Sequence, residues 1–231
     1  MEGVLLRKFQ ISFLLLFLVF FLISVSGCQT SKKEIDLPRP SLSQGPFQPK
    51  TAPASESARH QSHYTESISQ LNKVTQGTPY VELPLAEIIE LTKNAESERE
   101  VYKYAADAWS HEFFWKSTTE NGGGKPGGEI LGRLENSFGS YEQFRSAFLE
   151  TVDRLEGSGW VWLVLENGVL KVLSTSNYDI PAETTQPLLA LDAWEHAYMT
   201  EFGNNRQAYA ENFLNHLANW EFAEKNLTSL V

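Results

Sequence analysis

The hydrophobic pattern changes its period shortly after Leu155, and this change leaves few fold classes open. Before it, apolar residues recur at three- and four-residue steps, as in 64–74, which predicts amphipathic helices. After it, the apolar runs 160–165 and 169–173 flank Glu166-Asn167-Gly168, a strong signal for a β-hairpin. The pattern predicts an α+β fold, in which an N-terminal helical segment precedes a domain of helices and antiparallel strands.

The remaining elements follow from the same two periods. The expected sheet has three antiparallel strands, because a further short apolar run follows the hairpin. The glycine-rich segment 121–128 predicts a loop, and it lacks the residue order of a phosphate-binding loop. Helices are expected over 85–91, 101–115, 130–138, 141–155 and most of 194–227, and the third strand over 188–191.

The N-terminus has the features of an export signal. Arg7 and Lys8 precede an apolar run over 11–23, and Val25-Ser26-Gly27-Cys28 then resembles a lipobox. We therefore expect a lipoprotein signal peptide over 1–27 and a lipid on Cys28, which would anchor the chain to a membrane of the cell envelope on its extracytoplasmic side. An uncleaved membrane anchor is the alternative, although the run is shorter than the ~20 residues of a typical span.

Composition indicates how the rest of the chain is organised and which partners it excludes. Residues 28–57 are rich in Pro, Ser, Lys and Gln and have no apolar period, so they predict a flexible tether. The folded part is expected as an N-terminal helical domain over 58–115 and a C-terminal α/β domain over 116–231. A net charge of −10 argues against nucleic acid as a partner, because phosphate binding needs clustered Lys and Arg.

Few side chains can carry metal or acid–base chemistry. The chain has five histidines. Asp192 and His196 are four residues apart, one at a strand end and the other at a helix start, so both can reach one metal ion. The same spacing alone is more often a surface contact.

Four segments, taken in order, favour a metal site over a surface contact. Ala105–Trp115, Gly157–Leu163, Asp192–Tyr198 and Asn219–Phe222 resemble consecutive signature segments of the iron/manganese superoxide dismutase family. The likeness extends from about residue 79 to the C-terminus. It implies an oxidoreductase with one Fe or Mn ion per chain, which converts superoxide to dioxygen and hydrogen peroxide.

The resemblance also implies roles for individual residues. It makes His111, Asp192 and His196 metal ligands. Glu195 matches a glutamate that reaches across a dimer interface to a ligand histidine of the other subunit, so a homodimer is among the expected partners. The tryptophans that match the walls of the metal pocket are Trp115, Trp160, Trp162 and Trp194.

The fourth ligand has three alternatives, because the family places a ligand His, a second His four residues later and a gateway Tyr eight residues later. If Tyr64 is the gateway, Glu56 occupies the ligand position. If His60 is the ligand, Tyr64 falls in the middle and Ile68 replaces the gateway residue.

The third alternative aligns the chain with the family pattern without gaps as far as Leu85. It puts Arg59 at the ligand position and His63 in the middle. We favour His60, because neutral imidazole suits iron or manganese and arginine cannot coordinate a metal.

Other positions depart from the family. Asp107 stands where iron enzymes carry a glutamine, and Tyr178 where manganese enzymes carry one. Asp107 is expected to replace the glutamine as an acceptor and to favour the higher oxidation state. Met199 occupies the place of a common interface tyrosine.

Two further residues are expected to take part in catalysis. Tyr64 is the candidate gateway residue. Arg206, which matches an arginine near the substrate entrance, is the candidate for a local positive field in this acidic chain. Two alternatives to a working dismutase stay open: a catalytically weak metal-binding lipoprotein, and a metal-free structural protein with the same fold.

Overall fold

The computed structural model describes the backbone of residues 54–229 and the side chains of residues 59–229. The predicted signal peptide, Cys28 and most of the predicted tether lie outside the described residues. Within the described part, no helix is both long and apolar enough to cross a membrane.

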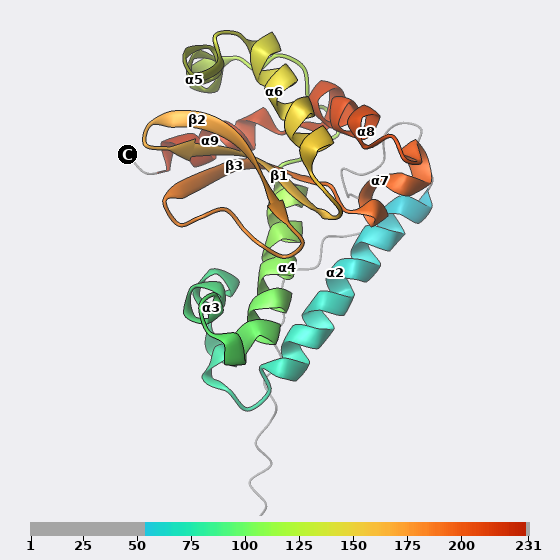
Figure 1. Ribbon diagram of the computed structural model, residues 1–231, viewed down its shortest axis with the longest axis vertical. Coiled ribbons are helices and arrows are strands. Elements are labelled where there is room, and N and C mark those ends of the chain that lie inside the picture. The colour runs from blue at the N-terminus through green and yellow to red at the C-terminus, as the bar shows by residue number, and fades with distance from the viewer. Residues whose placement is uncertain (1–53, 230–231) are drawn as a thin grey trace, which may run out of the picture. The chain divides into compact units, whose positions relative to one another are not determined.

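Three helices form the N-terminal part (Figure 1). α2 (Ala54–Val74) and α3 (Leu85–Thr92) both pack against α4 (Arg99–Lys116), and two short 3-10 helices, η1 (Pro79–Glu82) and η2 (Glu96–Glu98), lie in the connections. α2 begins at Ala54, so its first turn extends into the predicted tether. The buried core of this part includes Tyr64, Ile68, Leu71, Ile88, Ile89 and Val101.

The sheet consists of β1 (Gly159–Glu166), β2 (Val169–Ser176) and β3 (Thr185–Asp192), in the order β2-β1-β3. Both pairings are antiparallel, which confirms the predicted three-stranded sheet. The β1–β2 connection is the two-residue turn Asn167-Gly168, with φ of 51° and 79°. Positive φ at both positions is typical of a type I′ turn, and Asn-Gly is its preferred sequence.

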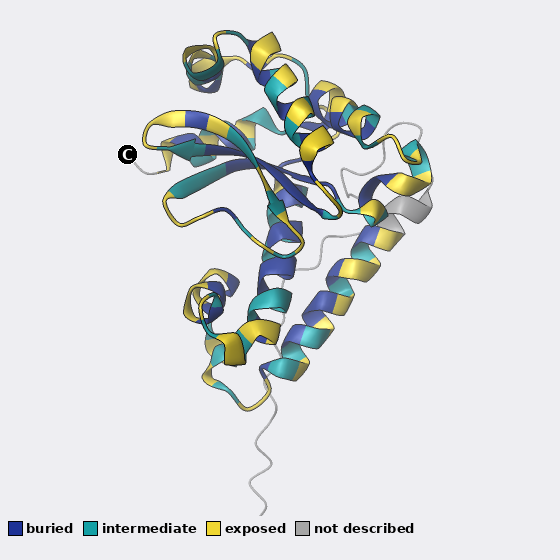
Figure 2. Cartoon of the chain, viewed as in Figure 1, coloured by how far each residue is buried: buried dark blue, intermediate teal, exposed yellow. Residues whose placement is uncertain are grey.

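The central strand β1 joins the sheet to α4. It is dark blue, and therefore buried, over most of its length in Figure 2. Because side chains alternate along a strand, Trp160 and Trp162 lie on one face. Trp162 stacks on Trp109 of α4 with ring centroids 5.9 Å apart, and Trp160 meets His111 edge-on at 5.1 Å. These contacts hold α4 against the sheet face that leads to the candidate site.

The C-terminal segment, expected to be mostly helical over 194–227, consists of four helical pieces. α7, α8 and a π-helical turn η3 follow β3 in that order, and α9 packs back on β3. Two earlier helices, α5 and α6, pack on β2. The bounds are α5 Gly128–Phe138, α6 Tyr141–Arg154, α7 Glu195–Phe202, α8 Arg206–Asn212, η3 Phe213–Leu217 and α9 Trp220–Thr228.

The glycine-rich loop has a structural role. The Gly123 amide donates to the Ala218 carbonyl at 2.8 Å, and the Gly124 amide donates to the Leu214 carbonyl at 2.9 Å. A Cβ at Gly123 would lie 2.2 Å from the carbonyl carbon of Asn215, so the two backbones can approach only where there is no side chain.

We expect Gly123→Ala to lower the free energy of unfolding by roughly 2–4 kcal/mol, because it combines a left-handed φ of 76° with a backbone clash. Gly124→Ala is the matched control, since its φ is 69° but nothing lies within 4 Å of the added carbon. It should cost only about 1 kcal/mol. Urea unfolding of both variants measures the difference, and equal losses would contradict the role of close packing.

Candidate metal centre

Four elements, of which only β3 and α7 are consecutive in sequence, bring one ionisable side chain each to a single point. These side chains are His60 of α2, His111 of α4, Asp192 of β3 and His196 of α7. The first three are buried, and the imidazole of His196 is only 9% exposed. We call these four residues the ligand cluster.

The centre of the ligand cluster is one carboxylate oxygen, Oδ2 of Asp192. The Nε2 atoms of His60 and His196 each lie 3.1 Å from it, and Nε2 of His111 lies 3.7 Å away. The candidate ligand atoms of His60, Asp192 and His196 are all within 4.8 Å of one another. This is close enough for all of them to bind one ion.

Local structure explains how Asp192 and His196 come together. Asp192 is the last residue of β3 and pairs with Trp160 across the sheet. Its Oδ1 accepts the backbone N–H of Trp194 at 2.9 Å, which orients the carboxylate and turns the chain into α7. His196 is then the second residue of that helix, and its ring points back to Oδ2.

The chemistry of His111 fits a metal ion. Its Nδ1–H donates to the backbone carbonyl of Asp107 at 2.8 Å, so its Nε2 carries a lone pair. That nitrogen is buried without a hydrogen-bond partner among the described residues, and it faces the Asp192 carboxylate, which is also an acceptor. Two acceptors face each other favourably when a cation lies between them, and a second-nitrogen hydrogen bond to a carbonyl is usual for a ligand histidine.

Burial and the neighbouring charges shift the pKa values in the cluster. Burial alone would raise the pKa of Asp192, but the facing His196 and the hydrogen bonds from His196 and His60 hold it well below its usual range. Burial lowers the pKa of His60 to about 4, against the opposing effect of Asp192. In the metal-free protein at neutral pH, the cluster therefore presents a carboxylate and a neutral His60 imidazole, the protonation states that metal binding requires.

Comparisons with known proteins identify the family. Residues 126–226 match the family described as iron/manganese superoxide dismutases, C-terminal domain. The chain is 40% identical over 168 residues to superoxide dismutase [Fe] of Leptolyngbya boryana, a match that covers 72% of this chain and 84% of the relative. The chain belongs to the iron/manganese superoxide dismutase family. Superoxide dismutase [Mn/Fe] of Rickettsia bellii is 40% identical over 171 residues, covering 73% of this chain and 81% of that protein.

The structure distinguishes the three alternatives for the fourth ligand, the one that the family places first in the sequence. His60 lies in the ligand cluster, whereas the side chain of Arg59 is exposed. The side chain of Glu56 lies outside the described residues. With His60 in the cluster, Ile68 takes the gateway position, and it is buried in the core of the helical part. The geometry therefore favours His60, and its binding of metal stays a prediction.

His63 also lies beside the cluster, although its side chain is exposed. Its ring stacks on His196 with centroids 4.1 Å apart and an interplanar angle of 21°. Burial of part of the ring, and then the neighbouring His196, lower the pKa of His63. His63 covers the cluster on the side from which solvent can approach.

Tyr64, the candidate gateway residue, is fully buried. Its ring meets Trp115 edge-on at 4.7 Å and lies 6.5 Å from His111. Its hydroxyl donates to Oε1 of Glu112 at 3.0 Å, and burial raises the pKa of this glutamate despite that hydrogen bond. Glu112 was missed in the sequence, where only its position next to His111 could have indicated it.

Asp107 has a partner that the sequence did not suggest. The hydroxyl of Ser67 donates to Oδ2 of Asp107, and both side chains are buried. Oδ1 of Asp107 lies 3.5 Å from Nδ1 of His111. Ser67 is eight residues after Arg59, so the gap-free alignment would have placed it at the gateway position.

The tryptophans predicted as pocket walls lie at different depths. Trp115 is 5.8 Å from His111, and Trp194 is 5.8 Å from His196, measured between ring centroids. Trp160 contacts His111 directly. Trp162 packs on Trp160 and donates from Nε1 to the Thr175 hydroxyl at 2.9 Å. It therefore stabilises the position of Trp160.

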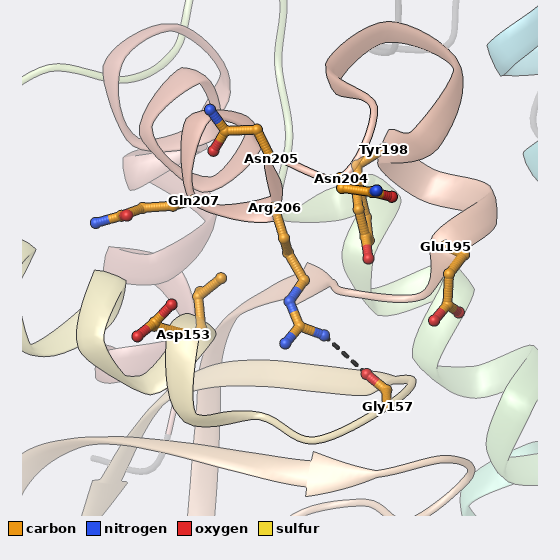
Figure 3. A pocket seen from close by; sticks show the side chains of 9 residues that line it. Asp153, Gly157, Glu195, Tyr198, Asn204, Asn205, Arg206 and Gln207 are labelled. Carbon is orange, nitrogen blue, oxygen red and sulfur yellow. Dashed lines mark hydrogen bonds between the residues drawn. The ribbon is translucent and has the colours of Figure 1, made fainter.

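Glu195 and Arg206 line a separate pocket of about 350 Å³ (Figure 3). The Arg206 guanidinium donates to the carbonyls of Gly157, at 2.7 Å, and Leu155. Glu195 accepts from the Ser158 hydroxyl at 2.6 Å, and this hydrogen bond lowers the pKa of its carboxyl. The predicted part of Glu195 in a dimer interface stays a prediction, and so does the effect of Arg206 on substrate.

The pKa of His60 predicts how the metal-free protein responds to acid. Because His60 takes up its proton near pH 4 when folded and near 6.5 when unfolded, the unfolded state binds more protons between these values. Stability should be full above pH 6.5 and fall by on the order of 3 kcal/mol as the pH drops to 4. Urea unfolding of metal-free protein across this range measures the loss.

Two variants test the assignment of that loss. His60→Gln should remove most of the pH dependence, because no imidazole is then buried at this position. His216→Gln, at an exposed histidine, should retain it. An unchanged pH dependence in His60→Gln would show that another group is responsible.

Proposed function

We propose that this chain is a superoxide dismutase of the cell envelope, acting at one iron or manganese ion held by the ligand cluster. The convergence of His60, His111 and His196 on the Asp192 carboxylate carries the proposal. Imidazole nitrogens with one carboxylate oxygen form a donor set that suits either metal. The names of the relatives, which specify Fe or Mn/Fe, support the same two ions.

The reaction consumes two superoxide anions and two protons and releases one dioxygen and one hydrogen peroxide. When bound, the ion supplies the electron transfer by alternating between its +3 and +2 states. The protein fixes the donors beforehand: the Asp107 carbonyl orients His111, and the Trp194 amide orients Asp192. The carboxylate of Asp107 adds a negative charge beside His111, which should stabilise the +3 state.

Protons are held close to the cluster by the pair of buried Tyr64 and half-buried Glu112. The Tyr64 hydroxyl carries one on Oη, and Glu112, whose pKa is raised by burial, can receive one at Oε1. Trp115 packs over this pair and, with Trp160, excludes bulk water from the His111 side of the cluster. Tyr64 is therefore proposed as the residue that holds a proton for the product.

A second candidate is a metal-binding protein with weak turnover. The Ser67–Asp107 hydrogen bond favours it, because a carboxylate engaged in this way cannot donate to a metal-bound solvent as a glutamine amide can. Tyr178 is also absent from the ligand cluster, and its ring instead contacts Trp194, with centroids 5.2 Å apart. Turnover, and not metal content, distinguishes the two candidates.

Metal analysis and a dismutation assay test the proposal together. Purified protein should contain near one iron or manganese ion per chain and should dismutate superoxide faster than free metal ion. His60→Ala and His111→Ala should each lose most of the metal, with affinity at least about 100-fold lower, because each removes a proposed ligand. His216→Ala is the control and should keep metal and activity.

Each remaining outcome has one meaning. Stoichiometric metal without turnover would support the weakly active metal-binding protein. Metal that survives His60→Ala would remove His60 from the ligand set. No metal after refolding with either ion would contradict both candidates.

We also propose that the protein is anchored by a lipid on Cys28 to a membrane of the cell envelope. The lipobox-like sequence that ends at Cys28 supports this location, and Cys28 is the only cysteine of the chain. At such a surface the protein would scavenge superoxide outside the cytoplasm.

The anchor can be tested by one substitution. Wild-type protein should partition with membranes and incorporate labelled fatty acid, whereas Cys28→Ser should do neither, because no other thiol can accept the diacylglycerol. Dismutase activity per metal ion should be unchanged. Label in the Cys28→Ser protein would contradict the proposed site.

A further inference from the structure

Superoxide is an anion, and this chain carries a net charge of −10, so the protein as a whole repels the proposed substrate. An efficient encounter needs a local cation near the opening of the site. The pocket around Arg206 does not meet this need by itself, because Asp153 and Glu195 line it as well. In Figure 3 both carboxylates lie in the same pocket as the guanidinium.

The accessible side of the ligand cluster is covered by a row of aromatic rings. His63, which is exposed, stacks on His196, and its ring centroid is 6.4 Å from Trp194. Trp194 in turn contacts Tyr178, with centroids 5.2 Å apart. Trp194 and Tyr178 are both half-buried, so this row of rings is partly accessible to solvent beside the cluster, and we call it the rim of the site.

Lys103 is the cation on this rim. Its Nζ lies 4.8 Å from the ring centroid of Tyr178 and 5.0 Å from that of Tyr104, both within the range of cation–π attraction. Among the described residues no carboxylate forms an ion pair with it. Aromatic rings hold an ammonium group in place without cancelling its charge, as a carboxylate would.

The position of Lys103 on α4 links it to the centre. Lys103, Asp107 and His111 follow one another at four-residue intervals, so they lie along one side of the helix. Eight residues correspond to about 12 Å along the axis. This slightly exceeds the Debye length of ~8–10 Å at physiological salt, so the attraction of an anion to Lys103 is partly screened there and is strongest at low ionic strength.

We propose that Lys103, held between Tyr104 and Tyr178, is the residue that steers superoxide to the metal centre. The inference rests on the proposed dismutase function and names the cation on which its encounter rate depends. Tyr178, which departs from the family pattern, then has a role of its own: it connects Lys103 to Trp194 at the rim of the site.

The test uses purified full-length protein loaded with iron. Lys103→Gln should lower kcat/KM for superoxide about two- to fourfold at low ionic strength and flatten its dependence on ionic strength. Lys103→Arg should restore both. The affinity for azide, a small monoanion, should fall by a similar factor in Lys103→Gln when followed by optical titration.

The control for overall charge is Lys171→Gln, which removes the same charge from an exposed site on β2. It should change neither the slope nor the azide affinity appreciably. If Lys103→Gln and Lys171→Gln behave alike in an active enzyme, the inference is overturned while the dismutase function stands. If wild-type protein shows no turnover, the proposed function fails, and azide affinity alone then decides whether Lys103 attracts anions.

Discussion

The buried carboxylate of Asp192 is the group on which the candidate site depends. An ionised carboxylate is costly to bury unless other groups compensate its charge. Here the compensation comes from the imidazoles of His60 on α2 and His196 on α7, each with Nε2 3.1 Å from the same oxygen. The site is therefore complete only when both parts of the chain are folded against each other.

The central strand and α4 supply the rigidity that this arrangement needs. Trp160 faces His111 on α4 and pairs with Asp192 on β3, so one residue of β1 relates two members of the ligand cluster. A shift of one residue in the register of β3 would turn the Asp192 side chain to the other face of the sheet. Packing of large aromatic rings thus determines where the donor atoms meet.

Around the ligand cluster, two pairs of residues shape the electrostatic environment. Asp107 is bound by Ser67, and Tyr178 contacts both Trp194 and Lys103. The first pair places a negative charge beside the metal centre, and the second places a positive charge at its rim. Together they give the ligand cluster an electrostatic environment set by residues that depart from the family pattern.

The sequence alone determined the α+β fold, the Asn167-Gly168 hairpin and the convergence of Asp192 with His196, because each depends on spacing within a short segment. Helical period could not choose among the candidates in α2, since residues four apart share a face. Only the tertiary structure placed His60 beside Asp192, 132 residues away, and revealed the Ser67–Asp107 bond between residues 40 apart. Such contacts depend on how α2 is rotated against α4 and α7, and no local pattern records that rotation.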